Sequence, residues 1–95
     1  MFVVTLKLSD NRAKASALME GHNAWIKRGF DDSIFLLTGS LRSNAGGAVL
    51  AHNTTRADLE ARLKEDPFVA EGVVSADILE IEPGRTEDRL AFLKA

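Results

Sequence analysis

The apolar residues of this chain alternate with polar ones, or run together, in four short segments, a pattern typical of β-strands. In the first segment Phe2, Val4, Leu6 and Leu8 share one face, while Val3 makes the other face apolar as well. The four predicted strands cover Phe2–Leu8, Ile34–Leu41, Ala48–His52 and Val73–Glu82. The turn-rich segment Arg42–Gly47 predicts a hairpin loop between the second and third strands.

Two segments between the strands have the spacing of amphipathic helices. The first helix is predicted to begin after the capping side chains of Ser9–Asn11 and to run to about Arg28, with Gly29 just past its end. Its apolar stripe consists of Ala15, Leu18, Met19, His22, Trp25 and Ile26.

The second helix is predicted to begin at a cap formed by Thr54 or Thr55, and it presents Leu59 and Leu63 to the core. Pro67 ends it, because the residue before a proline avoids the helical region. One further short turn is expected over residues 67–71, before the fourth strand begins.

The predicted order of elements is βαββαβ, which indicates a ferredoxin-like α+β fold: a four-stranded antiparallel sheet with two helices on one face. One domain is expected over residues 1–95. The helices cannot cover Val3, Phe35, Leu37 and Val49 together, so the other face of the sheet needs cover. We therefore expect two sheets to pack face to face in a homodimer. The tail contains Leu90, Phe92 and Leu93, which predict packing groups rather than free coil.

Composition narrows the functional classes. Hydrophobic residues make up 45% and charged residues 27% of the chain, which is typical of globular proteins. The net charge is −2 with scattered lysines and arginines, so no nucleic-acid partner is expected. The chain has no cysteine, which excludes disulfides and thiolate chemistry. No signal-like or membrane-spanning segment is visible, so we expect a cytoplasmic protein with no membrane association.

His22 and Asp66 are the best candidates for a functional pair. His22 lies within the apolar stripe of the first helix, where a histidine is either a satisfied core residue or a group oriented by a partner. Asp66 precedes Pro67, so it is equally a helix cap. A carboxylate can serve both roles at once. Both helices cover the same face of the predicted sheet, so contact between the two side chains is feasible.

Four segments of the chain resemble the YciI-like (YCII-related) family. They are Gly21-His22-Asn23-Ala24-Trp25, Phe35-Leu36-Leu37-Thr38-Gly39-Ser40, Gly46-Gly47-Ala48-Val49-Leu50-Ala51-His52 and Glu65-Asp66-Pro67-Phe68. The resemblance implies a dimeric α+β barrel with a His–Asp dyad in a pocket, where His22 and Asp66 are the matching residues. It also implies chemistry related to that of a family member that removes halide from a hydroxylated aromatic compound.

The chain departs from the family pattern after its second predicted strand. The family commonly has Ser-Gly-Pro there, whereas this chain has Thr38-Gly39-Ser40. Ser40 is therefore either a donor to a ligand near the dyad or an ordinary turn residue. Gly39, Ser40, Arg42 and Phe68 are predicted to contact the ligand.

The main hypothesis is a lyase- or isomerase-type enzyme that acts on a small acidic or hydroxylated aromatic compound. His22 would be its general acid or base, oriented by Asp66. The alternative is a non-catalytic small-ligand-binding or accessory module of the same fold, and a haem protein with His22 as axial ligand is a third possibility. No cofactor is expected. His22 and His52, with no acidic residues at supporting spacing, do not predict a metal site.

Overall fold

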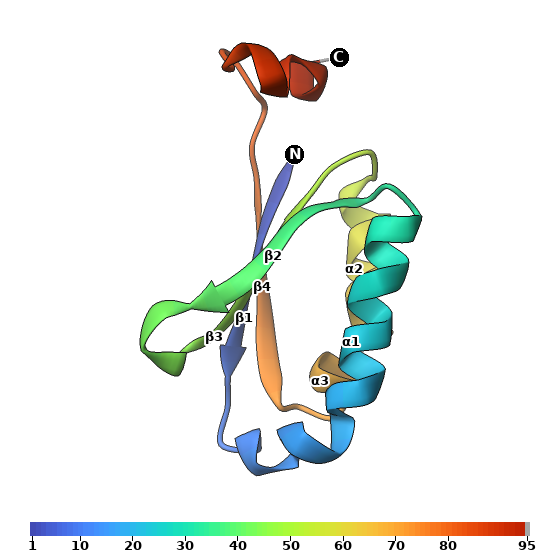
Figure 1. Ribbon diagram of the computed structural model, residues 1–95, viewed down its shortest axis with the longest axis vertical. Helices are drawn as coiled ribbons and strands as arrows, with labels where there is room; N and C mark the ends of the chain where they lie inside the picture. The colour runs from blue at the N-terminus through green and yellow to red at the C-terminus, as the bar shows by residue number, and fades with distance from the viewer. Residues whose placement is uncertain (95) are drawn as a thin grey trace.

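The computed structural model describes residues 1–94. A four-stranded antiparallel sheet has the strand order β2-β3-β1-β4. The strands are β1 (Phe2–Leu8), β2 (Phe35–Leu41), β3 (Gly46–Ala51) and β4 (Val74–Glu80). The helices α1 (Ala15–Asp31), α2 (Arg56–Lys64) and α3 (Pro67–Ala70) all lie on one face of the sheet (Figure 1). This is the ferredoxin-like α+β fold that the sequence predicts.

Three short 3₁₀ helices complete the chain: η1 (Arg12–Lys14), η2 (Arg42–Asn44) and η3 (Asp88–Lys94). η1 precedes α1, and η2 forms the connection between β2 and β3. η3 stands beyond the end of the sheet, at the end of an extended stretch that follows β4 (Figure 1). None of the helices in residues 1–94 is both long and apolar enough to cross a membrane.

Helix α1 continues through Gly29, so the prediction that Gly29 lies past its end is wrong. A Cβ atom at Gly29 would lie 2.1 Å from ring carbons of the buried Phe35, so the absence of a side chain lets β2 approach the helix. The helix instead ends at Asp31 with Asp32 as its C-cap, and the next residue, Ser33, has a left-handed φ of 62°. The N–H of Ser33 donates to Phe30 O and that of Ile34 donates to Gly29 O, the pattern of a Schellman motif.

The core lies between the sheet and the helices. It contains Phe2, Val4 and Leu6 from β1, with Leu59 and Leu63 from α2. The hydroxyl of Thr55 caps α2 by accepting from the N–H of Asp58, at 3.1 Å. Thr55 is therefore the cap, rather than Thr54.

Two of the four residues that we expected to exceed the cover of the helices lie beneath them. Phe35 and Val49 are buried on the helix side of the sheet. A register irregularity between Phe35 and Leu37 places these two residues on opposite faces of β2. The uncovered face instead presents Val3, Leu37, Leu50 and Leu79, because Val3 is directly opposite Leu50 and Leu79, and Leu37 is opposite Leu50. An apolar row therefore crosses all four strands.

The tail expectation is met only in part. Residues 88–94 are helical rather than coil, and the ring of Phe92 contacts that of His52 edge-on, with centroids 5.4 Å apart. Leu90 and Phe92 nevertheless remain 43% and 48% exposed, so the chain's own body does not bury them.

Candidate active site

Asp66 lies at the junction between α2 and α3. Its extended backbone makes it the N-cap of α3, and its Oδ1 accepts a hydrogen bond from the N–H of Phe68 at 3.0 Å. Pro67 takes the first helical position, where its missing N–H has no cost. Asp66 is the one charged residue among the described residues that is buried, with no accessible surface.

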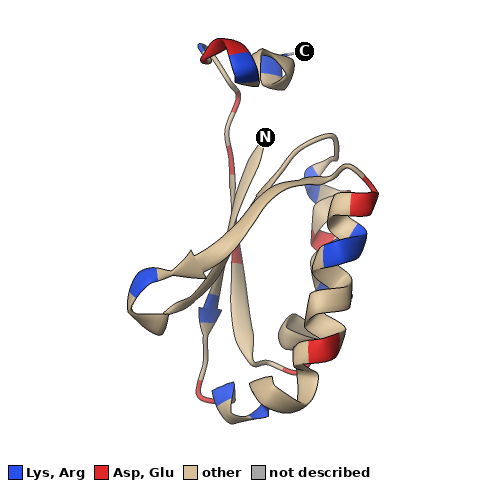
Figure 2. Cartoon of the chain, in the orientation of Figure 1, with Lys and Arg blue, Asp and Glu red and all other residues tan. Residues whose placement is uncertain are grey.

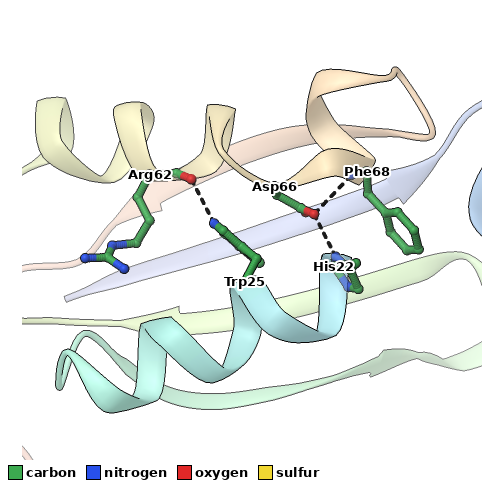
Figure 3. A network of polar contacts seen from close by, with 5 residues as sticks. All are labelled: His22, Trp25, Arg62, Asp66 and Phe68. Atoms are coloured by element: carbon green, nitrogen blue, oxygen red, sulfur yellow. Dashed lines mark hydrogen bonds and ion pairs between the residues drawn. The ribbon is translucent and has the colours of Figure 1, made fainter. Parts of the chain in front are cut away.

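His22 projects from the middle of α1 toward this cap. Its Nδ1 lies 2.8 Å from Asp66 Oδ1, so one carboxylate oxygen accepts from both His22 and Phe68 (Figure 3). The imidazole stacks on the Phe68 ring, with centroids 4.0 Å apart and planes 7° apart. The orientation of the histidine is thus fixed at the ring edge by Asp66 and at the ring face by Phe68.

Two features hold α1 close to the junction between α2 and α3, where Asp66 lies. A Cβ atom at Gly21 would lie 3.1 Å from the Pro67 ring, so the glycine allows close approach of α3 beside His22. One turn further on, the indole N–H of Trp25 donates to the carbonyl of Arg62 at 2.8 Å (Figure 3). Trp25 is buried and ties α1 to α2, so it is a core residue as the sequence suggested.

The hydrogen bonding also sets the tautomer of His22. A carboxylate only accepts, so Nδ1 carries the proton and Nε2 is left as the acceptor nitrogen. Within residues 1–94, Nε2 has no hydrogen-bond partner. The other carboxylate oxygen, Asp66 Oδ2, is buried and has no partner among the described residues.

His22 lines a cavity of about 450 Å³ between α1 and the sheet. This volume lies within the range of small-molecule sites, about 300–1,000 Å³. Its walls are mostly apolar and include Leu6, Met19, Val49 and Val74. The polar side chains that line it are those of His22, Asn23, Thr38, Ser40 and Asn44. No Lys, Arg, Asp or Glu is among the described residues of its lining.

The structure brings most of the predicted site residues together. The cavity is lined by Gly39, Ser40 and Phe68 together with His22. Asp66 does not line the cavity and contacts it only through its hydrogen bond with His22. Arg42 does not line the cavity; it belongs to η2, at the exposed tip of the β2–β3 connection. His52 is also outside the lining. No group of three or more metal-ligating side chains occurs in the described part of the chain.

Sequence reasoning did not select three polar lining residues, Asn23, Thr38 and Asn44. Asn23 directly follows His22, and Thr38 is opposite the buried Val49, so its side chain shares the helix-facing side of the sheet. Two-residue alternation back from Ser40 could have assigned Thr38 to the same face as Ser40. Asn44 has a left-handed backbone at the last residue of η2, and no periodic signal indicates its position.

Together, the fold and this geometry define a class: a ferredoxin-like α+β protein with a carboxylate-held histidine at the wall of a small, uncharged cavity. No protein-family model and no curated protein matches the chain by sequence. The chain is similar in structure to 5-chloro-2-hydroxyhydroquinone dehydrochlorinase (TftG) from Burkholderia phenoliruptrix AC1100, solved in complex with 2,5-dihydroxybenzoquinone. The TM-score is 0.72 at 12% identity, covering 87% of this chain and 94% of that one, which shows a common fold.

Proposed function

We propose that this protein is a small general acid–base enzyme of the YciI-like type that acts on a hydroxylated aromatic compound. The observation that carries the proposal is the pairing of His22 Nδ1 with the buried Asp66, which leaves Nε2 of a cavity-lining imidazole as a proton acceptor. A histidine held in one tautomer by a carboxylate is a typical general base.

The character of the cavity favours a neutral ring substrate. Its lining combines apolar walls with uncharged hydrogen-bonding side chains, and none of the residues 1–94 that line it supplies a cation to pair with a carboxylate or phosphate. Hydroxyl and carbonyl groups on a planar ring match Asn23, Thr38 and Ser40, while the ring itself matches the apolar walls. The structurally similar dehydrochlorinase, solved with a dihydroxybenzoquinone, supports this substrate class.

The chemistry assigned to the dyad is proton transfer. Nε2 of His22 removes the proton of a ring hydroxyl, and Asp66 stabilises the imidazolium that forms. Where a ring carbon carries a halogen, the proton taken up by Nε2 is delivered to that carbon, which becomes tetrahedral as the ring hydroxyl becomes a carbonyl. Loss of a second hydroxyl proton then forms the second carbonyl, and the C–halogen bond breaks with its electron pair. The product is a quinone, and one proton and one halide leave in total. General acid–base help of this kind is worth about 10²–10⁴ in rate.

The test compares the two histidines of the chain. Chlorinated hydroxyhydroquinones are offered as substrates, and chloride release and quinone absorbance are followed for the wild type, His22→Ala and His52→Ala. His52 lies outside the cavity lining, so its variant is the matched control. We expect turnover in the wild type and the control and its loss in His22→Ala. Turnover that persists in His22→Ala refutes the role of the dyad.

A second measurement addresses the alternative of a non-catalytic binding module. Calorimetric titration with 2,5-dihydroxybenzoquinone reports binding independently of turnover. Binding without turnover of any hydroxylated aromatic offered, combined with a loss of stability in His22→Ala, supports the binding module instead of the enzyme.

We also propose that the protein is a homodimer in which the uncovered sheet faces pack together. The apolar row across the four strands supports this arrangement, because Leu79 is 63% exposed and Leu37 is 51% exposed at its two ends. Monomeric proteins rarely leave a contiguous apolar patch of this kind in water.

A further inference from the structure

The segment after β4 forms an arm that leaves the body of the molecule. Ile81 and Met1 still exchange backbone hydrogen bonds at the end of the sheet, at 2.8 and 2.9 Å. Beyond Ile81 the chain is extended until η3, which stands past the sheet (Figure 1). The radius of gyration is 13.6 Å, whereas a compact chain of this length has about 12 Å. We define residues 82–94 as the C-terminal arm.

The arm carries apolar side chains that its own chain leaves exposed. Leu90 and Phe92 are both nearly half exposed. They lie on η3, which contacts the body of the molecule through the rings of Phe92 and His52. The charged residues of the arm are of both signs (Figure 2), so the arm presents no single-sign surface for a nucleic acid or a strongly charged partner.

The uncovered face alone is small for a stable dimer. Its strands have six or seven residues, and four such strands present a plane of roughly 440 Å² at a spacing of about 4.8 Å and a rise of about 3.3 Å per residue. A standard interface takes about 800 Å² from each partner. A face of this size is therefore small for a stable dimer, and a segment outside the sheet that packs on the second copy would enlarge the interface.

The arm is continuous with this face. It begins directly after Ile81, which is itself 43% exposed at the end of β4, the strand that contributes Leu79 to the apolar row. In a twofold dimer, one such arm on each chain adds its area twice. We propose that the C-terminal arm packs on the second copy, with Leu90 and Phe92 buried against the partner. This inference rests on the proposed homodimer and specifies which segment completes its interface.

Sedimentation velocity and light scattering over a dilution series test the proposal. The full chain is compared with the double variant Leu90→Ser/Phe92→Ser, with a chain ending at Glu82, and with Ala91→Ser as a control at an exposed position of the same helix. We expect the dimer dissociation constant to rise roughly 100-fold in the double variant and in the shortened chain, because two apolar side chains lose their burial on each of two arms. The control should match the full chain.

Amide hydrogen exchange of residues 85–94 gives a second readout. In the full chain, protection of the arm should increase with protein concentration in step with dimer formation, whereas in Leu79→Ser it should be lost together with the dimer. A dimer whose dissociation constant is unchanged in the double variant overturns the arm proposal and leaves the homodimer standing. A full chain that is monomeric at every concentration overturns the homodimer itself.

Discussion

Replacement of Asp66 separates its capping role from its role toward His22. In Asp66→Ala the N–H of Phe68 loses its cap, which costs about 1 kcal/mol. The His22 Nδ1–H loses a charged acceptor at 2.8 Å, which costs about 1.5–3 kcal/mol. Asp66→Ala also removes the cost of burying a charged group, which offsets part of this loss. We expect the free energy of unfolding to fall by about 2–3 kcal/mol.

Asp66→Asn is the matched variant. Its amide oxygen can take the place of Oδ1 and accept from both Phe68 and His22, while the charge is removed. We expect it to lose at least about 1 kcal/mol less stability than Asp66→Ala, since both hydrogen bonds are retained. If the dyad is catalytic, the asparagine variant still loses turnover, because a neutral amide does not stabilise the imidazolium.

Urea denaturation followed by circular dichroism measures the stability difference, and a melting curve should show Asp66→Ala lower by about 10–20 °C. Long-range ¹H–¹⁵N NMR of the His22 ring reports its tautomer. The proton should be on Nδ1 in the wild type and move to Nε2 in Asp66→Ala. Two results would refute the conclusion that Asp66 Oδ1 accepts stabilising hydrogen bonds from both Phe68 and His22. One is a free energy of unfolding of Asp66→Ala within about 0.5 kcal/mol of the wild type, and the other is an unchanged His22 tautomer in that variant.

Three further substitutions test the local packing by urea denaturation. Gly29→Ala should destabilise the protein by about 2 kcal/mol, because its Cβ would overlap the buried Phe35 ring; a gain in stability would contradict the close approach. Ser33→Gly should stabilise it by about 0.5–1 kcal/mol, since glycine adopts the left-handed conformation without a Cβ penalty, and a loss would argue against this helix end. Trp25→Phe should cost about 2–3 kcal/mol by leaving the Arg62 carbonyl without its indole donor, and an unchanged midpoint would show that the bond contributes nothing.

The order and type of the elements could be predicted from local patterns. The predicted first strand has the bounds of β1, and Thr55 caps α2 as one of two predicted alternatives. Pro67 separates α2 from α3 and begins the short helix expected there. Hydrophobic periodicity, helix-capping side chains and prolines act on residues only a few positions away. The features that depend on them can therefore be predicted from the sequence alone.

The end of α1 and the faces of β2 and β3 could not be read in this way. Glycine is the residue type that most often follows the end of a helix. Gly29 nevertheless lies inside α1, because Phe35 approaches it from a strand. Phe35 lies in a continuous apolar run, and its face depends on an irregularity of strand pairing rather than on alternation. Both outcomes are decided by contacts between elements that local sequence does not encode.

For the candidate site, the sequence by itself determined the chemistry available: two histidines, no cysteine, and an aspartate placed to cap a helix before a proline. Only the tertiary structure decided that Asp66 is fully buried and bonded to His22, and that Arg42 stays outside the cavity. His22 and Asp66 are 44 positions apart in the chain. Their contact depends on how closely α1 and α3 pack at Gly21 and Pro67, a distance fixed by side-chain volumes across the interface rather than by any local pattern.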